Sequence, residues 1–170
     1  MIDEKFKQII QSKTGCAVVL AGSDSDRAHV DRIVASLKAF DIPHRVRICS
    51  AHKQPVELMN LIEEYNAIGG SVAFIAVASG TDALSGILSF HALGPVISCP
   101  PDGPNESCLT NPPGSSNAYI ERPENVGKFI AQIYAGINPT FRRHLEQIKA
   151  QKLHKLRKTD ADLRAKSKGT

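Results

Sequence analysis

A histidine and a lysine stand side by side in the segment Ser50-Ala51-His52-Lys53-Gln54-Pro55. Residues 44–49 alternate polar and apolar side chains and predict a strand, whereas the apolar residues after Pro55 recur at helical spacing. Ligands of open α/β sheets bind at the carboxyl ends of strands. There, an imidazole can carry a proton near neutral pH and a lysine can hold an anion. The alternative is a turn in which His52 only satisfies a backbone group.

A second polar group, Gly22-Ser23-Asp24-Ser25-Asp26, follows the apolar residues 16–21. A turn of small residues at the start of a helix offers unpaired backbone amides, which suit a phosphate or another anion. We expect one of the two aspartates to cap the helix and the other to accept hydrogen bonds from ligand hydroxyls. Helix capping alone is the simpler interpretation of the same residues.

Two further strands are predicted at residues 72–78 and 95–99. The first runs into Ser79-Gly80-Thr81-Asp82, where Asp82 is the expected cap of the next helix. The second ends at Pro100-Pro101. The loop at residues 100–116 is too long for a simple connection, so we expect it to be functional, interfacial or mobile.

The other five histidines lack a partner at catalytic spacing. They are predicted on helix or strand surfaces, at a helix end or in the basic C-terminal segment: His29, His44, His91, His144 and His154. The chain has no GxGxxG, GxxxxGK[ST] or GxSxG pattern, so dinucleotide, P-loop and serine-hydrolase chemistry lack their usual support. What remains is a small polar ligand held at strand ends, with His52 available for proton transfer.

The order of the segments predicts the fold. Strand-like and helix-like segments alternate, which is typical of an α/β protein with helices on both faces of a parallel sheet. A short amphipathic helix precedes the first strand, residues 118–120 are a possible fifth strand, and a helix with an apolar stripe follows over residues 126–134. At 170 residues, the chain is the size of one domain.

The positive charge is concentrated near the C-terminus. Residues 142–170 contain ten Lys or Arg and three Asp or Glu, so the first 141 residues carry a net charge of −3 although the whole chain carries +4. We predict a basic helical arm that is solvated or covers a partner. We do not expect nucleic-acid binding, because interleaved aromatic residues and a reading motif are missing.

The four cysteines, Cys16, Cys49, Cys99 and Cys108, are widely spaced and predict no zinc site. The first three lie in or beside apolar strands, where buried reduced thiols are common. With no signal peptide before the domain, a reducing cytoplasm fits best. The longest apolar run is well short of the roughly 20 residues that a membrane span needs, so we expect a soluble protein.

Four segments in register resemble the phosphoribosylaminoimidazole carboxylase family of de novo purine synthesis. They are Ala21-Gly22-Ser23-Asp24-Ser25-Asp26, Ser50-Ala51-His52-Lys53, Ala83-Leu84-Ser85-Gly86 and Ile97-Ser98-Cys99-Pro100-Pro101, and the match covers roughly residues 15 to 138. Lys53, the Leu-Ser-Gly sequence and Cys-Pro-Pro resemble the second class, a carbon–carbon lyase run as a carboxylase of aminoimidazole ribonucleotide (AIR) with carbon dioxide. The first class is a mutase that isomerises carboxyaminoimidazole ribonucleotide.

The resemblance also implies an architecture. The family has a flavodoxin-like three-layer sandwich around a parallel sheet, which would occupy residues 1–138, with residues 139–170 as the basic helical extension. It implies a homo-octamer whose sites are built at subunit junctions. The chemistry needs no metal, biotin or other cofactor, because the aminoimidazole is itself an electron-rich nucleophile.

Site roles follow from the same resemblance. Ser23 and Asp26 would hold the ribose phosphate, and Ser50 and Lys53 would close on the substrate. His52 would be the general acid and base that takes the proton from the imidazole carbon as the carbon–carbon bond forms.

Ser79 and Thr81 would line the far wall near the carboxylate. Here the second class usually reads Ala-Gly-Arg-Ser-Asn, whereas this chain has Ala78-Ser79-Gly80-Thr81-Asp82. A capping role for Asp82 would turn its charge away from the ligand. The alternatives to the carboxylase are the mutase and a non-catalytic paralogue that binds a sugar phosphate.

Overall fold

A five-stranded parallel sheet forms the centre of the computed structural model, which describes residues 2–167. The strand order is β2-β1-β3-β4-β5. The bounds are β1 Cys16–Ala21, β2 His44–Ile48, β3 Val72–Val77, β4 Val96–Ser98 and β5 Ala118–Tyr119. Each strand begins and ends within one residue of its prediction. The order is that of flavodoxin-like sheets, so the expected fold is confirmed.

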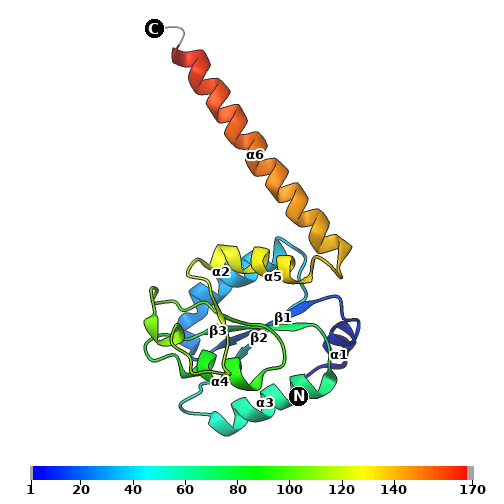
Figure 1. The fold of residues 1–170 in the computed structure, drawn as a ribbon, viewed down its shortest axis with the longest axis vertical. Helices are drawn as coiled ribbons and strands as arrows, with labels where there is room; N and C mark the ends of the chain where they lie inside the picture. Colours follow the sequence, from blue (N-terminus) through cyan, green and yellow to red (C-terminus); the bar gives the residue numbers. More distant parts are fainter. Residues whose placement is uncertain (1, 168–170) are drawn as a thin grey trace.

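Helices cover both faces of this sheet (Figure 1). The helices are α1 Glu4–Gln11, α2 Arg27–Lys38, α3 Pro55–Ile68, α4 Ala83–His91, α5 Val126–Tyr134 and α6 Pro139–Ser167. Helices α2 and α5 lie on one face, and α3 and α4 lie on the other. Three short 3₁₀ segments complete the elements: η1 Asp24–Asp26, η2 Glu106–Cys108 and η3 Pro123–Asn125.

The two central strands, β1 and β3, are buried at every position. Successive side chains of a strand point to opposite faces, so each strand contributes to both cores. Val18 and Phe74 belong to the core under α3 and α4, whereas Val19 and Ile75 belong to the core under α2 and α5. A strand covered on both faces requires an unbroken apolar run, which is why these strands were predictable.

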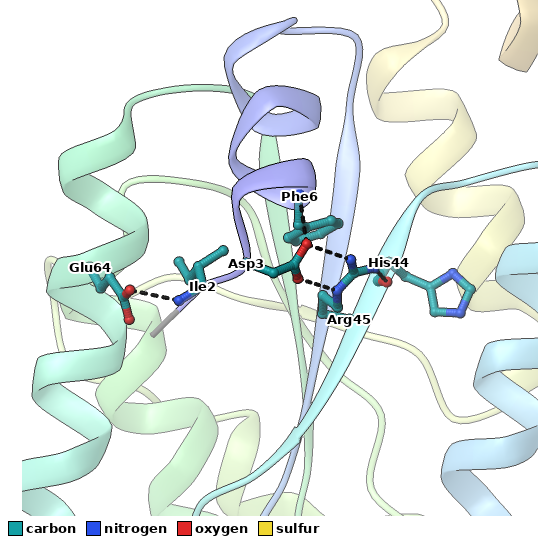
Figure 2. A network of polar contacts seen from close by, with 6 residues as sticks. All are labelled: Ile2, Asp3, Phe6, His44, Arg45 and Glu64. Carbon is teal, nitrogen blue, oxygen red and sulfur yellow. Dashed lines mark hydrogen bonds and ion pairs between the residues drawn. The ribbon is translucent and has the colours of Figure 1, made fainter.

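The N-terminal helix is tied to β2 and α3 by polar contacts (Figure 2). Asp3 caps α1 by accepting from the Phe6 N–H at 3.0 Å and also receives two 3.0 Å hydrogen bonds from the Arg45 guanidinium. That guanidinium lies 4.5 Å from the Phe6 ring centre, a cation–π distance. The Ile2 N–H donates to Glu64 Oε1 at 2.8 Å. The contacts of Asp3 with Arg45 and of Ile2 with Glu64 fix the start of α1 beside β2 and α3.

The predicted basic arm is helix α6, which projects far from the sheet (Figure 1). Its first turns pack on the core through the buried Phe141 and the half-buried Leu145 and Ile148. Every side chain from Lys149 to Ser167 is exposed. Between residues 2 and 167, no helix combines the length and apolar character needed to cross a membrane.

Gly127→Ala tests the close contact between α5 and α2. The Gly127 N–H donates to Ser36 Oγ at 3.0 Å, and a Cβ at this position would overlap Ser36 O. Although alanine favours helices over glycine by about 1 kcal/mol, we expect the overlap to lower the free energy of unfolding by about 1–3 kcal/mol in urea denaturation. Gly136→Ala is the control, because among residues 2–167 only its own chain neighbours come within 4 Å of its added Cβ. A free energy of unfolding equal to that of wild type in Gly127→Ala would contradict the close contact between α5 and α2.

Candidate active site

A cavity of about 100 Å³ lies where the carboxyl ends of β1, β2 and β3 meet. In this strand order, the chain crosses from one side of β1 to the other at this place, which is the usual ligand position in open α/β sheets. The lining comes from the three loops that follow these strands: Gly22, Ser23, Asp26, Ser50, Ala51, His52, Ala78, Ser79, Thr81, Ala83 and Leu84.

Six of the seven residues predicted for the site line this one cavity. They are Ser23, Asp26, Ser50, His52, Ser79 and Thr81. Lys53 is the exception: its side chain is exposed and lies outside the lining that the described residues form. The fold therefore gathers hydroxyls, one carboxylate and one imidazole at a single place, with an ammonium group one residue away along the chain.

The turn after β2 is closed by Ser50 and Gln54. Ser50 Oγ accepts from the Lys53 N–H at 3.3 Å, and the Ser50 N–H donates to Gln54 Oε1 at 3.2 Å. His52 is exposed, and no group among residues 2–167 is hydrogen-bonded to its imidazole. The alternative in which His52 satisfies a backbone group is therefore wrong, because the Ser50 hydroxyl does so. The imidazole remains available to a ligand.

Ser23 caps the helical turn after β1. Its Oγ accepts from the Ser25 N–H at 3.2 Å and from the Ser25 hydroxyl at 2.8 Å, whereas Asp26 makes no capping bond to α2. The expectation of an aspartate cap is therefore wrong, since the shorter serine side chain reaches the Ser25 amide within the tight 3₁₀ turn. Asp26 is buried, and among the described residues its Oδ1 has only a long 3.4 Å contact with the Ser25 hydroxyl, whose one proton goes to Ser23 Oγ. Its carboxylate keeps acceptor capacity at the cavity.

Asp82 caps α4, as predicted. Its Oδ1 accepts from the Ser85 N–H at 2.8 Å, and the residue lies outside the cavity lining. The side chain is almost fully buried, and Oδ2 has no hydrogen-bond partner in the described part of the chain. Burial raises the pKa of Asp82, against the lowering effect of the Ser85 hydrogen bonds. The acidic residue next to the site thus points into the protein.

The long loop after β4 packs on the wall that carries Ser79 and Thr81. The Gly80 N–H donates to Asp102 Oδ2 at 2.7 Å, and Asn105 Nδ2 donates to Gly80 O at 2.8 Å. Burial acts to raise the pKa of Asp102, but the hydrogen bonds from Gly80 and Asn105 prevail and lower it. The sequence analysis missed these two residues. Their short polar side chains, which often bond backbone groups in turns, were the available signal.

His29 was predicted on a helix surface, but its side chain is partly covered. It is half-buried, and its Nε2 lies 3.0 Å from Cys99 O at the end of β4. Burial lowers the pKa of His29, and burial raises the pKa of the Cys99 thiol to about 12. A thiol with this pKa stays protonated and is no nucleophile. All four cysteines are free and buried, which confirms the expected burial of Cys16, Cys49 and Cys99.

Comparison with known proteins identifies the family. The family model described as AIR carboxylase matches residues 16–155. The chain belongs to the AIR carboxylase family. This family acts in purine biosynthesis, and the family assignment rests on most of the chain. The match continues into α6, whose first turns contribute Phe141, Leu145 and Ile148 to the core of the AIR carboxylase fold.

Individual relatives agree. The chain is 33% identical to phosphoribosylaminoimidazole carboxylase of Treponema denticola over 69% of this chain and 78% of the relative. It is 35% identical to the human bifunctional phosphoribosylaminoimidazole carboxylase/phosphoribosylaminoimidazole succinocarboxamide synthetase over 78% of this chain, but spans only 33% of that protein. The crystal structure of Treponema denticola PurE matches 88% of this chain and 98% of its own, with a TM-score of 0.82 and 29% identity.

Asp82→Asn tests the buried carboxyl. The amide retains an oxygen that can accept from the Ser85 N–H but carries no charge. A carboxyl whose pKa is raised on folding contributes stability below its unfolded pKa, and this contribution is lost as pH rises through the folded pKa. Urea unfolding at a series of pH values from acid to neutral should therefore show the variant gaining stability relative to wild type as pH rises.

The control for this experiment is Asp82→Ala, which removes the cap as well as the carboxyl. It should show the same pH dependence relative to wild type and be about 1 kcal/mol less stable than Asp82→Asn at all pH values. If the difference in free energy of unfolding between wild type and Asp82→Asn does not vary with pH, the raised pKa of the buried Asp82 carboxyl is contradicted.

Proposed function

We propose that this protein carboxylates 5-aminoimidazole ribonucleotide with carbon dioxide to 4-carboxy-5-aminoimidazole ribonucleotide in de novo purine biosynthesis. The observation that carries the proposal is the exposed His52 imidazole, which has no hydrogen-bond partner among residues 2–167. It lies in a cavity lined by hydroxyls and the Asp26 carboxylate, in a member of the AIR carboxylase family. The Treponema relative is itself named a phosphoribosylaminoimidazole carboxylase.

The chemistry requires one new bond and one proton transfer. The electron-rich imidazole carbon of AIR attacks the carbon of carbon dioxide, and the carbon–carbon bond forms as one C–O π bond becomes a carboxylate lone pair. His52 then accepts the proton from the same ring carbon, and the C–H electron pair restores the aromatic ring. Because His52 is exposed, it can pass that proton to solvent. The reverse sequence decarboxylates the product.

The remaining residues bind and orient the substrate. Asp26 keeps acceptor capacity for ribose hydroxyls, and Ser23 lies beside it at the same helical turn. Ser50 and the charged Lys53 side chain close on the substrate from the neighbouring loop. Ser79 and Thr81 donate from the wall near the new carboxylate. Holding both reactants in one small cavity supplies the proximity that the carboxylation needs.

The choice of carbon dioxide over the mutase reaction rests on the class signatures. Lys53, Ala83-Leu84-Ser85-Gly86 and Cys99-Pro100-Pro101 resemble the second class. Two residues of the middle signature, Ala83 and Leu84, line the cavity with His52, so they are in a position to influence the reaction. The mutase is the alternative, and it needs the same histidine for its proton transfers.

His52→Asn should lower the turnover rate sharply. Loss of the general acid and base should lower kcat by about 10²-fold to 10⁴-fold, while the Kd of AIR should change by less than about threefold, roughly 0.7 kcal/mol. Product formation from AIR and carbon dioxide gives kcat, and calorimetry gives Kd. His154→Asn, on the exposed part of α6, is the matched control. Full activity of His52→Asn would contradict the assigned role.

The two enzyme classes are separated by the substrate that wild-type protein uses. Product from AIR and carbon dioxide, with no conversion of carboxyaminoimidazole ribonucleotide, supports the proposal. The opposite result would establish the mutase. Binding of AIR without turnover of either substrate would indicate a non-catalytic sugar-phosphate-binding protein and refute both reactions.

We also infer a cytoplasmic homo-octamer in which the exposed part of α6 covers a neighbouring subunit. Three leucines there, Leu153, Leu156 and Leu163, are 43%, 67% and 62% exposed. The arm is strongly basic, whereas the first 141 residues carry −3, so a second copy offers charges of the opposite sign.

Replacing these three leucines with glutamine tests the arm. Glutamine keeps helix propensity similar to leucine, and the exposed positions leave the core intact. Light scattering should show a native mass below that of wild type, with the unfolding midpoint of the isolated subunit unchanged. A native mass equal to wild type would contradict the role of the arm.

A further inference from the structure

We infer that Asp102 and Asn105 are positioning residues that hold the Ser79–Thr81 wall in the conformation that binds substrate. This inference deepens the proposed function and rests on it. The two residues lie in the loop between β4 and β5, and neither lines the cavity formed by the described residues. They act through the peptide of Gly80, which stands between the two wall residues.

The Gly80 peptide is held through both of its polar groups. Its N–H donates to Asp102 Oδ2 at 2.7 Å, and its carbonyl accepts from Asn105 Nδ2 at 2.8 Å. These contacts join positions 22 and 25 residues apart in the sequence. The acceptor of the first bond is a carboxylate, and such charge-assisted bonds are shorter and stronger than neutral ones.

Every polar hydrogen on the side chains of Asn105 and Ser107 is donated to a hydrogen bond within the cluster that these residues form with Gly80 and Asp102. The two amide hydrogens of Asn105 go to Gly80 O at 2.8 Å and to Asp102 Oδ1 at 3.2 Å. Ser107 has one hydroxyl proton, and its shorter contact is with Asn105 Oδ1 at 2.6 Å, which leaves its oxygen to accept from the Asp82 N–H at 2.9 Å. Asn105 is buried, and its N–H donates to Tyr119 Oη at 3.2 Å. The cluster is thereby anchored to β5.

The wall needs this support because its central residue is glycine. Gly80 has φ +66°, in the left-handed region, and apart from its chain neighbours no atom of the described residues lies within 4 Å of where its Cβ would be. Glycine loses more backbone freedom on ordering than any other residue, and Ser79 and Thr81 on either side are exposed. Packing does not restrain this segment, so the hydrogen bonds from Asp102 and Asn105 select its conformation.

The same bonds bear on how substrate anions are recognised. A backbone N–H in a left-handed turn is a common anion donor, but that of Gly80 is already taken by the Asp102 carboxylate. In the proposed complex, the hydroxyls of Ser79 and Thr81, and not the Gly80 N–H, would bind the substrate carboxylate from this wall. Their placement depends on the Gly80 peptide between them.

Hydrogen exchange of the Gly80 amide tests the contact without any ligand. In Asp102→Ala, exchange should accelerate at least about tenfold, the effect of losing one hydrogen bond of this strength. Glu106→Ala is the matched control, because it removes the same charge from the same loop at an exposed position and should leave exchange unchanged. Equal exchange rates in wild type and Asp102→Ala would overturn the inference.

Kinetics separate positioning from a purely structural role. Asp102→Ala should raise the KM of AIR about tenfold with kcat within about threefold, because binding is weakened and His52 is untouched. Asp102→Asn retains a carbonyl oxygen for the Gly80 N–H, but its amide nitrogen cannot accept from Asn105 Nδ2, so this variant should recover part of the loss. Faster exchange with an unchanged KM would leave Asp102 a structural residue and overturn its positioning role. Absence of wild-type turnover would instead refute the proposed reaction, while the Kd of AIR in these variants would still decide the role of Asp102.

Discussion

The site depends on the register of β1 with β2 and β3, which makes the three strands end side by side. Ala21, the last residue of β1, pairs with Ile48 of β2 on one side and Val77 of β3 on the other. The ladder continues one step further, since the Cys49 N–H donates to Ala21 O and the Gly22 N–H donates to Val77 O, both at 2.9 Å. Three strands thus end at the same height, and their loops leave the sheet side by side.

Burial on both faces of the sheet fixes the register of these strands. β1 and β3 expose almost no surface, and a shift by one residue would move every side chain into the opposite core. Phe74 could not replace Ile75 without repacking both layers of helices. The register, and with it the distance between the loops, is therefore fixed by packing far from the cavity.

The polar residues at the strand ends divide into two groups. Ser23 and Ser50 close turns, and Asp82 caps a helix, so their hydrogen bonds shape the loops. His52 and Asp26 keep most of their capacity for a ligand. Because Ser23, Ser50 and Asp82 maintain the loop conformations, His52 and Asp26 are not needed for that purpose. A site that transfers a proton and binds hydroxyls requires such available groups.

Local physics made much of this fold predictable. The apolar runs of β1 and β3 require burial on two faces, Asp82 precedes a helix as caps do, and His52 follows an alternating strand. Six of the seven predicted site residues meet in the cavity for this reason: each one follows a predictable strand, and parallel strands end at one edge. The family resemblance depends on the same segments.

Only the tertiary structure decided the remaining contacts. Whether Ser23 or an aspartate caps its turn depends on backbone geometry, and the burial of His29 against Cys99 joins residues 70 positions apart. The hydrogen bond from the Gly80 N–H to Asp102 likewise requires the loop after β4 to fold back over the end of β3. The sequence by itself determined the strands, the helices and the residues at strand ends, because these follow from periodicity and neighbouring side chains. Contacts between distant loops came from packing alone, because no local pattern records which loops meet.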